Sequence, residues 1–150
     1  MPEQPEQTER PAQAEQLAAL ESVAWLCVRD GRLLAVRTHG KDRFYLPGGK
    51  LEPGESGPRA LARELGEELG VRADARELTE AFVIEDEAHG QGGRPLRMTC
   101  YTGPATGALQ PDREIAELDW FRDRPADTER CAPALRQVLT RLTTDGVLAR

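Results

Sequence analysis

The sequence predicts one domain of the α+β class, and three features of its pattern support this. Short segments with β-strand composition lie on both sides of a central amphipathic segment. A second pattern with helical spacing ends the chain. A chain of 150 residues is also long enough to bury a substantial core in a single domain. These elements alone predict a mixture of α and β structure and no particular order of strands.

The chain is expected to begin with a disordered tail over residues 1–16, and residues 17–150 are expected to form the domain. The tail is rich in Pro, Gln and Glu, and after Met1 it has no aliphatic residue larger than alanine. Such a segment buries too little apolar surface to offset the entropy lost on ordering.

The first strands are predicted over residues 22–29 and 33–37, which are β-rich and largely apolar. Asp30-Gly31 between them is a strong hairpin signal, so the two are expected to pair antiparallel. Residues 44–46 form a third, short strand that leads into a glycine turn and a Pro/Gly-rich loop.

A short helix is predicted after this loop, because Leu61, Leu65 and Leu69 recur at the spacing of a buried helical stripe. Ser56 is suited to cap its start, and Gly70 is suited to end it in the left-handed conformation. The remaining strands are expected over residues 78–85, 96–102 and 114–121, before a C-terminal helix around residues 134–142.

The central helix concentrates acidic side chains on one side. Glu64, Glu67 and Glu68 fall within an arc of roughly 100°. Like charges at this spacing repel by about 0.2–0.5 kcal/mol per pair, and Gly66 costs about 1 kcal/mol more than alanine. Helix stability therefore does not explain the cluster. A hard divalent cation such as Mg²⁺ or Mn²⁺, which prefers oxygen ligands, does explain it.

The spacing of these residues resembles the Nudix box, G-x5-E-x7-R-E-U-x-E-E-x-G-U, in which U is an aliphatic residue. Counting from Gly49, Glu55 follows after five residues, and the sequence RELGEELGV follows after seven more, so every defined position is filled. The resemblance implies the Nudix fold, an α/β/α sandwich around a mixed β-sheet, over roughly residues 21–145.

The resemblance also implies roles for the box residues. Glu67 and Glu68 would be the main metal ligands, and Glu64 would be a further ligand or the base that acts on water. The backbone carbonyl of Gly49 would complete the coordination. Arg63 would orient the carboxylates, as a charged planar group beside anionic oxygens can.

Three further residues would support the box residues without binding the metal ion: Glu55, Gly48 and Gly70. Family members commonly add one acidic ligand from a loop before a late tryptophan-containing strand. Glu114 is the candidate here, and Glu117 is the alternative.

The sequence indicates the residues that contact the substrate less clearly than it indicates the metal ligands. Lys50 is either a phosphate partner or an ordinary surface lysine. Candidates for contact with a nucleobase are Trp25, Phe44, Tyr45, His89 and Trp120. Among these, Trp25 is most simply a core residue and His89 is most simply an exposed loop residue, and contact with the substrate is the alternative for each.

The implied function is metal-dependent hydrolysis of a pyrophosphate bond in a nucleoside diphosphate linked to another group. The expected substrate is a (deoxy)nucleoside triphosphate, in normal or oxidised form, giving the monophosphate and pyrophosphate. ADP-ribose, other nucleotide sugars and dinucleoside polyphosphates are the alternatives. A non-catalytic nucleotide sensor is disfavoured because every box carboxylate is present.

Composition limits the partners. The net charge of −6 argues against general binding to nucleic acid or to an anionic membrane, but not against a phosphorylated substrate beside bound cations. Three scattered cysteines, Cys27, Cys100 and Cys131, suggest buried free thiols and a cytoplasmic location. The oligomeric state stays open, and homodimers are common in the family that the box resembles.

Overall fold

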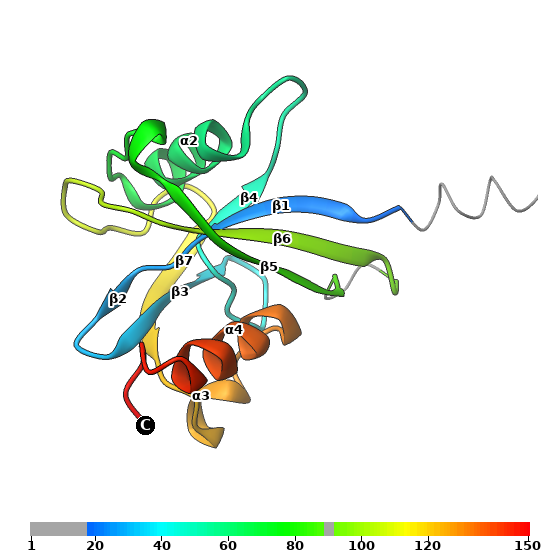
Figure 1. The fold of residues 1–150 in the computed structure, drawn as a ribbon, viewed down its shortest axis with the longest axis vertical. Helices are drawn as coiled ribbons and strands as arrows, with labels where there is room; N and C mark the ends of the chain where they lie inside the picture. Colours follow the sequence, from blue (N-terminus) through cyan, green and yellow to red (C-terminus); the bar gives the residue numbers. More distant parts are fainter. Residues whose placement is uncertain (1–17, 89–91) are drawn as a thin grey trace, which may run out of the picture.

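The computed structural model describes residues 18–88 and 92–150, which form two β-sheets and two main helices (Figure 1). The first sheet is mixed, because β1 runs parallel to β6 while the other pairs are antiparallel. Across this sheet the strands are β4 (Gly48–Lys50), β1 (Leu20–Trp25), β6 (Pro95–Thr102) and β5 (Thr79–Glu87). The predicted tail, residues 1–16, lies outside the described residues.

The second sheet is antiparallel, with β3 between its two partners. Its strands are β2 (Val28–Arg29), β3 (Arg32–Thr38) and β7 (Ile115–Phe121). The mixed sheet and the α+β class agree with the prediction. The predicted strands at residues 78–85, 96–102 and 114–121 correspond to β5, β6 and β7.

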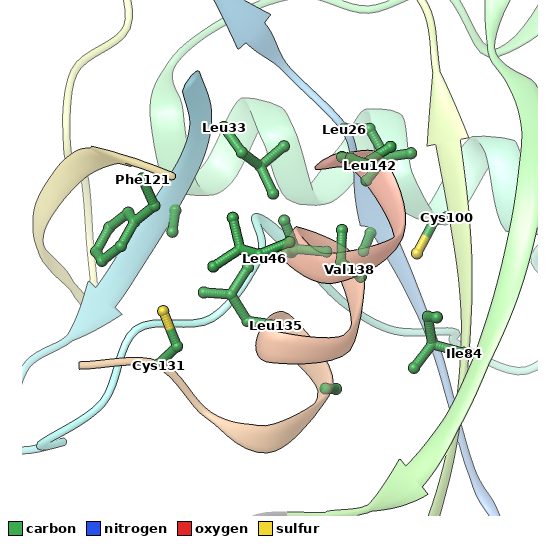
Figure 2. Close-up of a cluster of buried hydrophobic side chains, with 14 of the residues drawn as sticks. Leu26, Leu33, Leu46, Ile84, Cys100, Phe121, Cys131, Leu135, Val138 and Leu142 are labelled. Carbon is green, nitrogen blue, oxygen red and sulfur yellow. The ribbon is translucent and has the colours of Figure 1, made fainter. Parts of the chain in front are cut away.

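Helices cover the sheets on opposite sides, which gives the predicted α/β/α layers (Figure 1). The apolar stripe of α2 (Gly57–Leu69) packs in one buried cluster with Val23 and Leu34. On the other side, α4 (Pro133–Thr144) inserts Leu135 and Val138 among side chains from both sheets (Figure 2). The sequence predicted both helices.

The caps of α2 also agree with the sequence. The Ser56 hydroxyl accepts a hydrogen bond from the Arg59 backbone N–H at 3.3 Å, and Gly70 ends the helix with φ of 68°. A short α3 (Pro125–Thr128) and a 3₁₀ turn, η1 (Ala75–Glu77), were not predicted. Within the described ranges, every helix is too short or too polar to cross a bilayer.

The single strand predicted over residues 22–29 is wrong, because the chain changes sheets within it. Leu26 still donates its N–H to the Tyr101 carbonyl beside β1, whereas the Cys27 carbonyl accepts from Leu34 in the second sheet. The hairpin signal was correct for β2 and β3. Asp30 and Gly31 have φ of 53° and 72°, as a two-residue turn of this kind requires.

Two further predictions near the site need correction. Residues 44–46 form no regular strand, because Phe44 bridges Cys131 while Tyr45 bridges Val36, so neither pairing extends. The expected glycine turn is instead the edge strand β4, paired with β1. A side chain at Gly48 would overlap the Val23 carbonyl, which is why the two backbones can approach only with glycine there.

Candidate active site

Arg63 lies at the centre of the polar network on α2. Its Nε and Nη2 donate to the two carboxylate oxygens of Glu55 at 2.8 and 2.9 Å. Nη2 also donates to the Lys50 carbonyl at 3.2 Å, which ties the helix to β4. These hydrogen bonds lower the pKa of Glu55 to about 2 and raise the pKa of Arg63. Both groups therefore stay charged across the physiological range.

The same guanidinium also faces two further box carboxylates. Arg63 Nη1 lies 3.5 Å from Glu67 Oε2 and 3.7 Å from Glu64 Oε1. A rigid cation held by Glu55 can limit the rotamers of its neighbours. This is the geometry that the predicted orienting role of Arg63 requires.

Glu68 is the most buried acidic side chain of the box, with 8% of its surface exposed. Its Oε1 accepts the Gly48 backbone N–H at 3.1 Å, which links α2 to β4. Burial raises the pKa of Glu68 to about 8 against the opposing effect of this hydrogen bond, and the charges of Glu64, Glu114 and Glu67 add to the rise.

Glu64 occupies the space beside Gly49. A Cβ at that glycine would overlap the Glu64 carboxylate, so only glycine lets the side chain lie against the β4 backbone. Burial raises the pKa of Glu64 to about 7; the Arg63 charge opposes this, and Glu67 and Glu114 reinforce it.

Glu114 belongs electrostatically to this cluster although it is distant in sequence, since its charge raises the pKa of both Glu64 and Glu68. The backbone before it is attached to α2, where the Asp112 N–H donates to the Glu68 carbonyl at 2.9 Å. The alternative, Glu117, instead forms an ion pair with Arg37 at 2.8 Å. Glu114 therefore stays the predicted additional acidic ligand, whereas Glu117 is paired with Arg37.

The donor set fits a hard divalent cation. Crowded, partly buried carboxylates with raised pKa values are relieved by a bound cation, and the Glu64 carboxylate lies directly against Gly49, whose carbonyl is the predicted backbone ligand. Over residues 18–88 and 92–150, no three acidic, histidine or cysteine side chains already converge on one point. Glu67 and Glu68 would therefore have to exchange contacts with Arg63 and Gly48 for contacts with the ion.

A cavity of about 290 Å³ opens beside the carboxylates and is lined by Gly48, Gly49 and Glu68. Its walls are mostly apolar and come from both sheets and from the start of α4. They include Val23, Val36, Leu46, Met98, Ile115 and Leu135. The polar side chains of the lining are Ser22, Thr38, Lys41, Tyr45, Lys50, Glu68 and Glu87.

The structure brings Tyr45 and Lys50 to this cavity and leaves three other predicted contacts outside its lining. Phe44 packs on Phe121 in the core, with ring centroids 4.9 Å apart. Trp25 is buried in the cluster beside α2, and its Nε1 donates to the Gly103 carbonyl at 3.1 Å.

Trp120 lies half-buried beneath the Arg29 guanidinium, which is 5.6 Å from the ring centroid. His89 lies outside the described residues. Sequence reasoning missed Ser22, Thr38, Lys41 and Glu87. A serine inside an apolar strand was the one available signal, because the others meet only through the sheet order.

Comparison with known proteins gives a consistent picture. The sequence model of the NUDIX domain matches residues 19–141. The CTP pyrophosphohydrolase of Escherichia coli (strain K12) is 48% identical over 119 residues, which cover 77% of this chain and 84% of that protein. A MutT-like protein from Streptomyces ambofaciens is 47% identical over 62 residues, but these cover only 41% of this chain and 40% of that protein.

Among solved structures, the solution structure of the E. coli ORF135 protein matches with a TM-score of 0.68 and 30% identity. The match covers 87% of this chain and 92% of that chain.

Proposed function

This chain belongs to the NUDIX family, and we propose from that premise that it hydrolyses nucleoside triphosphates to the monophosphate and pyrophosphate. The enzyme class predicted from the box, a hydrolase of phosphorus anhydrides, agrees with the family and with the pyrophosphohydrolase relative. The observation that carries the choice of substrate is the cavity that opens directly onto Glu68 and the β4 glycines.

The size and lining of this cavity suit one nucleoside. A volume of about 290 Å³ is at the lower end of the range for small-molecule pockets, and its apolar walls favour a flat base. A dinucleoside polyphosphate or a nucleotide sugar would need a second shaped site for its other half. A triphosphate needs only charged contacts beyond the base.

Cytosine nucleotides are the first substrates to test. The E. coli relative that covers most of this chain is named as a CTP pyrophosphohydrolase. The cavity lining offers the Ser22 and Tyr45 hydroxyls and the Glu87 carboxylate, which can accept hydrogen bonds from an exocyclic amine. Uracil presents a carbonyl oxygen at that position, which cannot donate to the Glu87 carboxylate; the two hydroxyls can donate as well as accept, so Glu87 is the group that favours cytosine over uracil.

In the reaction, a water oxygen forms a bond to phosphorus while the bridging P–O bond breaks, and the bridging oxygen keeps the electron pair. A divalent cation held by Glu67, Glu68, Glu114 and the Gly49 carbonyl would supply charge neutralisation and a more acidic water. Glu64 is suited to accept the proton of that water, because its carboxylate lies beside Gly49, the predicted backbone ligand, and a positioned carboxylate can act as a general base.

The test is a panel of substrates with Mg²⁺ or Mn²⁺, in which chromatography of the nucleotide products measures turnover of every substrate. Coupled inorganic pyrophosphatase also reports the release of pyrophosphate from the triphosphates. The panel compares CTP, dCTP, the other nucleoside triphosphates, 8-oxo-dGTP, ADP-ribose and diadenosine polyphosphates. We expect the largest kcat/KM for a cytosine triphosphate. A preference for ADP-ribose or a dinucleotide would refute the proposal, and binding without turnover would favour a sensor.

A further inference from the structure

We infer that a groove beside α2 binds the two terminal phosphates of the substrate through Arg72 and Arg113, which selects triphosphates over diphosphates. This inference rests on the proposed function and adds two substrate-binding residues to it. The groove has a volume of about 590 Å³. Its lining is Ala62, Arg63, Gly66, Glu67, Val71, Arg72, Ala73, Asp112 and Arg113.

Two adjacent residues of α2 line the groove and the nucleoside cavity. Glu68 lines that cavity, and its neighbour Glu67 lines the groove. In this proposal, the chain of phosphates leaves the cavity, passes over these two carboxylates and ends in the groove. Cations held by the carboxylates would bridge the middle of the chain, and the far end would meet the arginines.

Both arginines are exposed and available. Over the described part of the chain, neither guanidinium has a side-chain hydrogen bond or ion pair, whereas Arg63 is held by Glu55. Their backbones are nevertheless fixed. Arg72 exchanges two hydrogen bonds with Thr106, at 2.9 and 2.8 Å, so its side chain projects from a defined point.

Arg113 has an unusual backbone conformation, with φ of 52°, which is unfavourable for a residue that has a side chain. Its backbone N–H donates to the Asp112 carboxylate at 2.7 Å, so both the N–H in this turn and the Asp112 carboxylate have a hydrogen-bond partner. Arg113 directly precedes Glu114, the expected additional ligand. The turn therefore places a groove-lining arginine directly before the expected additional metal ligand.

Gly66 supports the same inference because helix packing does not require it. A Cβ there would meet only the Val71 carbonyl, at an ordinary distance of 3.7 Å. A glycine inside a helix is nevertheless unfavourable relative to alanine. Its position in the lining keeps the groove open between Arg63 and Arg72.

The chemistry of the groove suits pyrophosphate. The lining has three arginines, of which Arg63 is held by Glu55, and two acidic residues, of which Glu67 would be neutralised by a metal ion. Guanidinium groups bind phosphate oxygens through paired hydrogen bonds, and exposed unpaired arginines lose little on doing so. A nucleoside diphosphate lacks the terminal phosphate and would leave part of this site unused.

The test compares CTP and CDP hydrolysis by wild type, Arg72→Ala, Arg113→Ala and the double variant, with Arg32→Ala as control. Arg32 is an exposed arginine in the β2–β3 hairpin, outside the groove. We expect kcat/KM for CTP to fall about 10-fold or more in each single variant, and kcat/KM for CDP to change less than about 3-fold. Inhibition by free pyrophosphate should weaken in parallel, and Arg32→Ala should match wild type.

A second variant tests the space itself. Gly66→Leu should favour the helix while filling the groove, so it should lower kcat/KM for CTP more than for CDP without lowering Tm. Equal losses of kcat/KM for CTP and CDP, or unchanged inhibition by pyrophosphate in the double variant, would refute the assignment of the groove as a phosphate-binding site. A wild type that turns over no triphosphate would instead refute the proposed function and the assignment that rests on it.

Discussion

Replacement of Glu68 by glutamine is expected to stabilise the metal-free fold while removing activity. Glu68 is almost fully buried, and its pKa rises from 4.5 to about 8, chiefly by burial. A carboxyl with a raised folded-state pKa favours folding below its unfolded pKa, and this contribution is lost as pH rises through the folded value. Wild type should therefore lose stability between about pH 4.5 and pH 8.

The magnitude follows from the shift. Each pKa unit corresponds to about 1.36 kcal/mol, so ionised Glu68 costs at most about 4 kcal/mol at pH 8. Movement of the side chain toward solvent will reduce this cost, and we expect about 1–3 kcal/mol. Glutamine cannot ionise and keeps an oxygen to accept the Gly48 N–H. In a domain of this size, Tm of Glu68→Gln should then exceed that of wild type by about 3–10 °C at pH 8.

The assay is thermal unfolding in EDTA at pH 4.5 and pH 8, with turnover measured separately in Mg²⁺. At pH 4.5 the wild-type carboxyl is largely protonated, so the two Tm values should nearly coincide; this is an internal control for packing. Turnover of the variant should fall by at least about 100-fold, because a metal ligand is lost. A Tm difference that does not change with pH would refute the electrostatic explanation.

Three further results are expected. Because Glu64 and Glu68 bind protons more tightly in the fold, Mg²⁺ should raise Tm more at pH 8 than at pH 6; equal shifts would place the ion elsewhere. Arg63→Lys should lower kcat/KM by about 10–100-fold while Tm changes little, because lysine cannot bond both Glu55 oxygens; unaltered kinetics would contradict an orienting role. Gly48→Ala should lower the free energy of unfolding, measured with denaturant, by about 2–4 kcal/mol, because the new Cβ meets the Val23 carbonyl. The control is Gly54→Ala, which has open space around it and should lower the free energy of unfolding by no more than about 1–2 kcal/mol.

The sequence determined the parts of this protein that depend on local spacing. The stripe at Leu61 and Leu65, the Ser56 cap and the Gly70 end define α2 within a few residues, because side-chain periodicity and capping act along one helix. The same local rules place the box carboxylates on a common side. The hairpin turn at Asp30 and Gly31 likewise follows from local chemistry.

The tertiary structure decided everything that depends on which strands are neighbours. An apolar run at residues 22–29 cannot show that it divides between two sheets, because its buried residues, 23–27, continue without a break across the point of change. The cavity beside Glu68 and the meeting of Glu114 with α2 arise from segments brought together by that sheet order. Alternation along a strand determines which side chains lie on the same side of the sheet. Only the pairing of strands determines which other residues those side chains contact.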